Sequence, residues 1–226
     1  MSHDFNVIGA DTDSIIFCKK DGSVFDKNEQ EELLNEINSL LPKNIVFAHD
    51  GIFPKVISLK TKNYILKDEN GKIKYKGSSL RNPSLEPALK EFLERTVTAI
   101  LEDKTNFEEI YKEYVKEALD IKDIKRWVTR KTISSKTLES ERTNESKIRD
   151  AIENTEYVEG DRIFVYFADD LSLKLSEKFD GKYDKKTLLV KLFKTTDRFS
   201  TVLNTKELFK NYGLKKHQEE LNAIIS

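Results

Sequence analysis

Two hydrophobic stretches flank a polar tetrapeptide near the start of the chain. FNVIGA (residues 5–10) and IIF (15–17) lie on either side of DTDS. Hydrophobic runs joined by polar turn residues in this way are typical of a β-hairpin. We therefore predict a hairpin over residues 5–17 whose tip carries the carboxylates of Asp11 and Asp13.

A helix is predicted next. Asp26, followed three residues later by Glu29, is a helix-start signal. The helix would present one hydrophobic face and end before Pro42. The members of that face are Leu33, Leu34, Ile37, Leu40 and Leu41.

Strand-like runs follow at residues 44–50, 53–59 and 63–68. The Asn70-Gly71 pair predicts a tight turn into a return strand over 72–77. The first part of the chain is therefore expected to combine a helix with an antiparallel sheet.

The hydrophobic period becomes helical beyond residue 82. Two helical patterns run from about residue 85 to 101 and from 107 to 119. Further on, the sequence predicts a basic, β-like segment (125–140), a short polar helix (144–154), a strand (160–167) and a mostly helical end (184–226). The predicted fold class is α+β, with an antiparallel β part over 1–82 and a mainly helical part over 83–226.

Composition excludes several classes of protein. Lys and Arg nearly balance Asp and Glu, for a net charge of -1, so any basic surface must come from local clustering. One cysteine, Cys18, excludes a disulfide framework and a cysteine-based zinc site. No segment is long and hydrophobic enough to span a membrane, and no signal-like stretch begins the chain. We expect no membrane partner and a cytosolic location, in a bacterial or virus-infected cell.

The paired carboxylates Asp11 and Asp13 suit a hard divalent cation. Mg²⁺ takes oxygen ligands and usually needs only one or two protein carboxylates beside substrate phosphates. DTDS alone equally fits an ordinary solvated turn. A helix-loop-helix calcium loop is excluded, because Ile15 and Ile16 stand where that loop needs Asp or Asn and then Gly.

Five segments, taken in order, resemble motifs of family B DNA polymerases. GADTDSIIF resembles motif C, a Tyr-Gly-Asp-Thr-Asp-Ser hairpin with palm carboxylates. SLKTKNYIL is similar to the Lys-Lys-x-Tyr motif, and KYKGSSLR to the Lys-Gly element before the thumb. WVTRKTISSKTL and EGDRIFVYF resemble thumb segments, closest to the T-even phage style. The resemblance implies that residues 1–82 form the C-terminal part of a palm and 83–226 a thumb.

The resemblance also implies a magnesium-dependent nucleotidyltransferase. Asp13, the main ligand, and Asp11 would serve a two-metal site shared with a carboxylate of motif A. Lys62 would reach the minor groove near the primer end, and Tyr64 would back the primer strand. Deoxynucleoside triphosphates and primer-template DNA would be the ligands.

Two positions depart from the family pattern. Gly9-Ala10 stands where the family has Tyr-Gly, so the tyrosine is absent. Thr61 replaces the first lysine of Lys-Lys-x-Tyr. Lys60 lies one residue away, and on a strand a shift of one residue reverses the face.

Motif A, motif B and the exonuclease motifs do not occur in the sequence. The resemblance therefore implies a partner, an N-terminal polymerase fragment with the exonuclease, motif A and motif B. Without it the chain would be inactive. Two origins fit a chain that opens ten residues before Asp11: a natural split subunit and a truncated piece of a longer polymerase.

Positive charge clusters in two segments. Residues 55–81 hold eight basic and two acidic residues, and 122–149 hold nine and four. Lys and Arg neutralise phosphates without reading sequence, as a polymerase requires. The hydroxyls of Ser134, Ser135 and Thr137 are further candidates for phosphate contacts. The expected DNA-binding residues are Lys60, Lys62, Tyr64, Lys76, Arg81, Arg130, Lys131, Ser135 and Lys136.

Three hypotheses remain open from the sequence. The chain completes a polymerase active site, or it is a non-catalytic DNA-binding thumb module derived from a polymerase, or it is a polymerase-derived interaction protein. A partner that encodes the missing motifs favours the first. DNA binding without such a partner favours the second, and loss of DNA binding as well favours the third.

Overall fold

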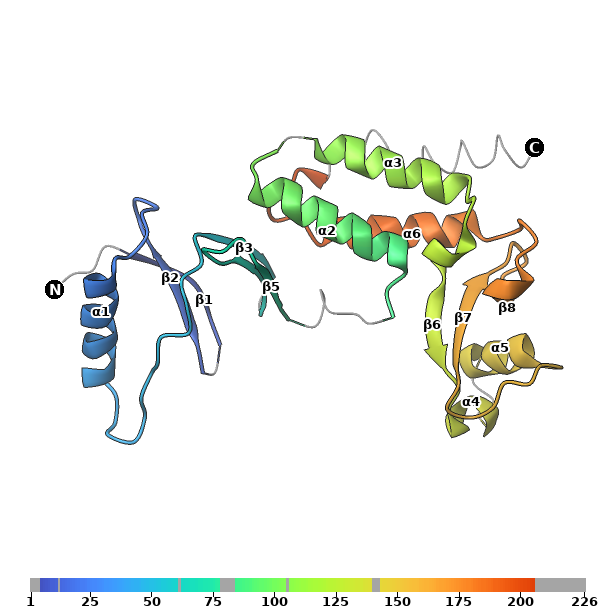
Figure 1. Cartoon of the computed structure of the whole chain (residues 1–226), viewed down its shortest axis with the longest axis horizontal. Coiled ribbons are helices and arrows are strands. Elements are labelled where there is room, and N and C mark those ends of the chain that lie inside the picture. The colour runs from blue at the N-terminus through green and yellow to red at the C-terminus, as the bar shows by residue number, and fades with distance from the viewer. Residues whose placement is uncertain are drawn as a thin grey trace. The chain divides into compact units, whose positions relative to one another are not determined.

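A computed structural model describes residues 5–11, 13–60, 62–77, 84–104, 106–139 and 143–205, with the backbone alone at 60, 143 and 144. The chain divides into two compact units, Met1–Arg81 and Asn82–Ser226 (Figure 1). This division falls one residue from the predicted boundary. Small antiparallel sheets and helices make the fold α+β, as predicted.

The first unit opens with the predicted hairpin. Strands β1 (Phe5–Ala10) and β2 (Ile15–Lys19) pair antiparallel, with Ala10 opposite Ile15. The register shifts between Val7 and Gly9, which marks a bulge. A bulge of this kind bends the strand and re-aims the side chains that follow it.

Helix α1 (Lys27–Ser39) begins with the predicted capping box. The Glu29 N–H donates to Asp26 Oδ1 at 2.9 Å, and the Asp26 N–H donates to Glu29 Oε2 at 2.8 Å. Leu33 is the buried residue of this helix. The predicted hydrophobic face was too long, because Leu40 lies beyond the last turn and is 81% exposed.

The segment 44–50 is not a strand, contrary to the prediction. The side chain of Asn38 holds Phe47 in place of a sheet neighbour. Its Nδ2 donates to Phe47 O at 3.0 Å, and Phe47 N–H donates to its Oδ1 at 2.7 Å. A backbone satisfied in this way needs no strand partner, and Val46 is 75% exposed.

The second sheet of this unit has the order β3-β4-β5 and is formed by β3 (Lys55–Lys60), β4 (Asn63–Lys67) and β5 (Ile73–Lys76). The predicted turn joins β4 to β5. Gly71 N–H donates to Asp68 O at 2.9 Å, and Asp68 N–H donates to Lys72 O at 3.0 Å. Gly71 has a φ of 80°, as a three-residue hairpin loop requires.

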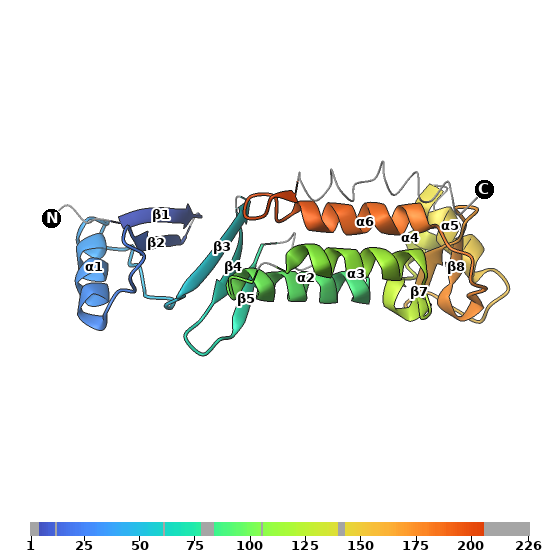
Figure 2. The ribbon, with the colours of Figure 1, turned by 90° about the horizontal axis from the view of Figure 1, so that it is seen from above.

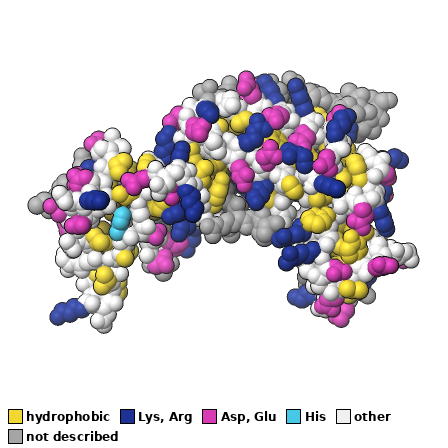
Figure 3. Space-filling model, viewed as in Figure 1, with side chains coloured by type: hydrophobic (Ala, Val, Ile, Leu, Met, Phe, Trp, Pro, Cys, Tyr) yellow, Lys and Arg dark blue, Asp and Glu magenta, His cyan; other side chains and the backbone are white. Residues whose placement is uncertain are grey.

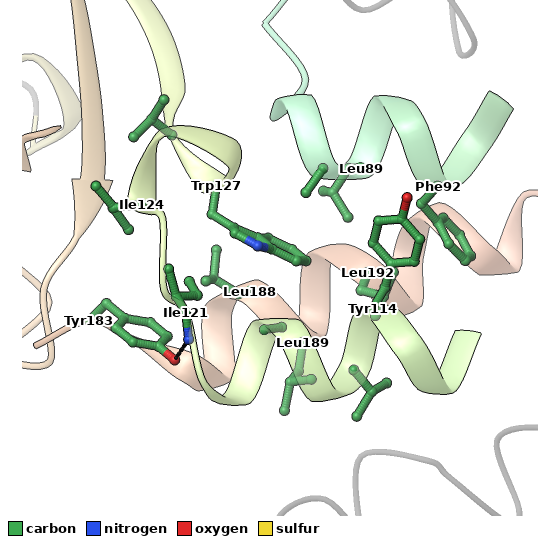
Figure 4. Close-up of a cluster of buried hydrophobic side chains, with 14 of the residues drawn as sticks. Leu89, Phe92, Tyr114, Ile121, Ile124, Trp127, Tyr183, Leu188, Leu189 and Leu192 are labelled. Carbon is green, nitrogen blue, oxygen red and sulfur yellow. Dashed lines mark hydrogen bonds between the residues drawn. The ribbon is translucent and has the colours of Figure 1, made fainter. Parts of the chain in front are cut away.

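Three helices form the larger core of the second unit: α2 (Pro87–Leu101), α3 (Phe107–Leu119) and α6 (Lys185–Asp197). They run alongside one another in both views (Figures 1 and 2). Trp127, at the end of the short helix η1 (Ile124–Trp127), lies among their leucines (Figure 4) and is 1% exposed. The Tyr183 hydroxyl accepts a hydrogen bond from the Ile121 N–H at 3.0 Å (Figure 4).

A three-stranded antiparallel sheet forms the rest of the second unit. Its strands are β6 (Thr129–Thr132), β7 (Arg162–Phe167) and β8 (Leu173–Leu175), in that order. Helices α4 (Ser135–Glu139) and α5 (Thr143–Ile152) lie between β6 and β7 in sequence, and η2 (Ser176–Lys178) follows β8. Only part of the basic segment 125–140 is therefore a strand.

Buried Glu86, 3% exposed, connects this sheet to the helices. Its carboxylate accepts from Thr129 Oγ1 at 2.8 Å and from Lys191 Nζ. The predicted helical segment beyond residue 205 lies outside the described residues. Among the residues that are described, no helix has the length and hydrophobicity needed to cross a membrane.

Candidate active site

The tip of the β1–β2 hairpin presents the two carboxylates predicted from DTDS. Asp11 N–H donates to Ser14 O at 2.8 Å, which closes the loop after Ala10 pairs with Ile15. Asp11 and Asp13 are both exposed. Asp13 has no ion pair or hydrogen bond within the described parts of the chain. Its carboxylate is therefore open to an external cation.

Lys62 meets this tip from the β3–β4 turn. Its Nζ lies 2.7 Å from Asp11 Oδ1, and its side chain is 61% exposed. The Asp11 carboxylate raises the pKa of Lys62, so the ammonium stays charged. Lys62 has a φ of 63°, a conformation that costs a non-glycine residue energy. This conformation occurs in the turn that places the Lys62 ammonium beside the Asp11 carboxylate.

The turn changes the interpretation of Lys60. Lys60 pairs with Asn63, and the register shifts between Ser58 and Lys60. Lys62 thus lies in a turn and not on a strand. Its ion pair with Asp11 places its ammonium at the hairpin tip.

Tyr64 packs against the hairpin at Gly9. A Cβ on Gly9 would lie 2.6 Å from Tyr64 Oη and 2.8 Å from two ring carbons. Tyr64 is 9% exposed. Gly9 thus leaves room for the ring of Tyr64 from β4. Because this contact is long-range, the sequence did not reveal it; a glycine inside a strand was the available signal.

Gly77 packs closely against the β3–β4 turn. Its φ is 99°, and a Cβ there would lie 2.4 Å from Lys62 O and 2.3 Å from Asn63 Oδ1. Lys76, just before it, pairs with Tyr64 across the sheet and is exposed. The structure therefore brings together Asp11, Asp13, Lys62, Tyr64 and Lys76. The side chain of Lys60 and the whole of Arg81 lie outside the described residues.

The donors at the tip fit part of a magnesium site. Both are carboxylates, the ligands that Mg²⁺ prefers, and one or two suffice when substrate phosphates supply the rest. The residues described include no group of three or more His, Cys, Asp or Glu that could hold a metal by itself. Asp11 already pairs with Lys62, so metal binding there competes with an ammonium.

Four predicted DNA-binding residues in the second unit are exposed. Arg130 and Lys131 lie on β6, and Ser135 and Lys136 on α4. Ser135 N–H donates to Glu159 Oε1 at 2.9 Å. Figure 3 shows both basic and acidic side chains on the face that it presents.

One predicted phosphate contact in the same segment was wrong. Thr137 is 4% exposed, and its Oγ1 lies 3.1 Å from Ser134 Oγ, with which it shares a hydrogen bond. Ser134 also approaches the Thr137 N–H at 3.3 Å, as a helix-capping residue does. These hydroxyls stabilise the start of α4. The Thr137 hydroxyl is buried and not available to a ligand, whereas Ser134 is exposed.

Some of the basic side chains in residues 122–149 are paired with carboxylates and therefore cannot all contact DNA phosphates. Arg126 donates to Glu117 at 2.7 Å and to Glu91 at 2.8 Å. The same Glu117 oxygen accepts Trp127 Nε1–H at 3.0 Å. Lys122 pairs with Asp120 at 2.9 Å. Part of this cluster therefore stabilises the fold.

Comparison with known proteins identifies a similar fold. No protein-family profile and no curated protein matches the sequence. Among solved structures, the family B DNA polymerase from the hyperthermophilic archaeon Pyrobaculum calidifontis matches with a TM-score of 0.67 and 17% sequence identity. The match covers 88% of this chain and 27% of that chain. The chain thus has the fold of part of a family B DNA polymerase; the likeness to T-even phages stays a prediction.

Proposed function

We propose that this chain is the C-terminal part of a DNA-directed DNA polymerase, either as a split subunit or as a piece of a longer chain. It would supply the motif C carboxylates and a grip on primer-template DNA. The observation that carries the proposal is the exposed pair Asp11 and Asp13 at a hairpin tip, in a fold similar to part of a family B polymerase.

In the proposed reaction Asp13 and Asp11 would hold Mg²⁺ together with a carboxylate from motif A, which this sequence lacks. When bound, such ions stabilise the attacking and leaving oxygens of an in-line displacement. Lys62 keeps its positive charge beside Asp11. When DNA binds, the Lys62 ammonium would leave Asp11 and pair with a primer phosphate or a minor-groove acceptor. The Asp11 carboxylate would then be free to bind the cation.

DNA affinity would come from phosphate contacts. Lys76, Arg130, Lys131 and Lys136 are exposed, and such contacts bind any sequence and weaken as salt rises. Tyr64 contributes by supporting the hairpin through Gly9. The incoming deoxynucleoside triphosphate would be bound by motif B, on a polypeptide that also carries motif A and the exonuclease. The complex would act wherever the replicated DNA resides.

The alternative is a non-catalytic, DNA-binding thumb module. One observation favours it: Asp11 is held by Lys62, and no complete metal-ligand group occurs among the described residues. On this alternative the carboxylates are structural and the basic residues alone matter.

Primer extension distinguishes the two. The chain, tagged and purified with its bound partners from the organism that encodes it, should extend a primer with Mg²⁺ and deoxynucleoside triphosphates. The chain alone should not. Asp13→Ala should bring down the same partners and abolish extension, whereas Asp50→Ala, at an exposed aspartate away from the hairpin tip in sequence, should extend normally.

Extension by the pure chain would contradict the proposal that further motifs are needed. Unchanged extension with Asp13→Ala would show that the hairpin carboxylates are not catalytic. A purified assembly that binds primer-template DNA but never extends it would favour the thumb-module alternative.

A further inference from the structure

Helix α5 covers one face of the sheet of the second unit. Ile163 and Val165 of β7 and Leu175 of β8 are fully buried, in a cluster with Ile148 and Ile152 of α5. Because side chains alternate along a strand, the residues between them point to the opposite face. That face is the subject of the inference.

Near the start of β7 the opposite face presents an exposed phenylalanine beside two arginines, whereas Tyr166, farther along the same face, is buried in the helical core. Phe164 of β7 is 49% exposed and pairs directly with Arg130 of β6. Two residues before it on the same face is Arg162, which pairs with Thr132. Arg130, Thr132 and Arg162 are all exposed. We call these four residues the β6–β7 face.

The arginines of this face are available to a ligand. Neither Arg130 nor Arg162 has an ion pair or hydrogen bond within the described parts of the chain. The adjacent carboxylates have backbone partners, since Asp161 accepts the Val158 N–H at 2.9 Å and Glu159 accepts the Ser135 N–H. Lys131 adds a further exposed charge on the same strand as Arg130.

An isolated exposed phenylalanine needs no explanation. Here, however, the ring neighbours two unpaired guanidinium groups, one directly opposite on β6 and one two residues before it on β7. Guanidinium groups bind phosphates, often through two hydrogen bonds. Aromatic side chains on an open surface stack with bases of single-stranded nucleic acid. A duplex keeps its bases stacked inside, so it would use the arginines and leave the ring without a partner.

We propose that the β6–β7 face binds single-stranded nucleic acid, with Phe164 stacked on a base and Arg130 and Arg162 on neighbouring phosphates. Among the residues expected from the sequence to bind DNA, only Arg130 belongs to this face. The proposal does not depend on the carboxylates at Asp11 and Asp13, so it can succeed or fail separately from the proposed function.

Fluorescence anisotropy with a labelled thymidine oligonucleotide tests it, beside a duplex probe of the same length. Phe164→Ala should weaken single-strand binding about tenfold, the scale for losing one stacked base. It should leave duplex binding within about twofold. Phe164→Trp should restore the affinity. Val158→Ala, at a 62% exposed hydrophobic residue away from this face, is the matched control and should change neither.

The arginines have a separate readout. The double variant Arg130→Gln, Arg162→Gln should reduce the dependence of log affinity on log salt by about 1.4, since each single-strand phosphate contact contributes about 0.7. Lys90→Gln and Lys116→Gln, at exposed lysines of α2 and α3, should together leave binding unchanged.

Three results would overturn the proposal. Phe164→Ala could bind single strands as tightly as the unaltered chain, which would leave the ring without a role. It could weaken duplex and single-strand binding equally, which would make the duplex the ligand. The arginine variant could keep the full salt dependence. Circular dichroism should show that every variant remains folded, as expected for exposed positions.

Discussion

Replacing Gly9 with alanine places a methyl group against the ring of Tyr64. The new Cβ would lie 2.6 Å from Tyr64 Oη and 2.8 Å from two ring carbons. Ordinary contacts between carbon atoms lie at about 3.5–4.0 Å, so the ring or the hairpin must move by about 1 Å. Overpacking of this kind typically destabilises by about 1–3 kcal/mol. We expect the loss to fall on the first unit.

Hydrogen exchange measured by mass spectrometry can locate that loss. In Gly9→Ala, peptides from β1, β2 and β4 should exchange faster, by about fivefold to a hundredfold for a loss of 1–3 kcal/mol. Fluorescence of Trp127 provides an internal control, because this is the only tryptophan and lies in the second unit. The midpoint of urea unfolding detected by Trp127 fluorescence should not change.

A double-mutant cycle tests the cause. If the ring is the obstacle, Gly9→Ala should cost little when Tyr64 is already alanine, and the two changes should be strongly non-additive. An equal cost of Gly9→Ala with and without the Tyr64 ring would refute the contact as the reason. Gly22→Ala is a useful comparison, because Gly22 has a φ of 77° but nothing within 4 Å of an added Cβ.

Three further predictions concern stability. Asp26→Ala should destabilise α1 by about 1 kcal/mol, since it removes the cap on Glu29 N–H, and exchange of α1 peptides should rise; unchanged exchange would argue against the cap. Glu117→Ala should leave the buried Trp127 N–H without its acceptor and cost about 1–3 kcal/mol in tryptophan-detected urea unfolding; a neutral effect would contradict this. Burial raises the pKa of Tyr111 to about 12, against about 10 in an unfolded chain. As pH rises, the Tyr111 hydroxyl therefore loses its proton first in the unfolded chain, and the stability of the folded state falls from about pH 10 to 12. Tyr111→Phe should make this fall less steep in calorimetry. An equally steep fall would contradict the assignment.

The elements that sequence predicted well are those with local signals. The hairpin at DTDS, the capping box of Asp26 and Glu29, and the turn at Gly71 each depend on residues close together in the chain. The segment 44–50 has a strand-like pattern but is held by Asn38, a residue from the preceding helix. A pattern of hydrophobicity carries no information about such a side chain.

The candidate site was predicted in composition but not in geometry. Asp11, Asp13, Lys62 and Tyr64 were named from their likeness to polymerase motifs. The ion pair of Lys62 with Asp11 and the packing of Tyr64 on Gly9 join segments about fifty residues apart in sequence. The β6–β7 face could not be predicted from the sequence for the same reason. It depends on the strand register, which places Phe164 opposite Arg130.

Single-turnover nucleotide addition by the assembled polymerase tests most directly whether the hairpin carboxylates are catalytic. It should be measured beside DNA affinity, because the two quantities separate chemistry from binding. We predict that Asp13→Ala lowers the rate by about a hundredfold or more, the scale for losing one charge-stabilising group, and leaves primer-template affinity nearly unchanged. Lys62→Ala should do the reverse, with weaker binding of the primer end and a smaller effect on the rate at saturating DNA. A near-normal rate for Asp13→Ala would contradict the catalytic assignment and leave a DNA-binding thumb module as the better description.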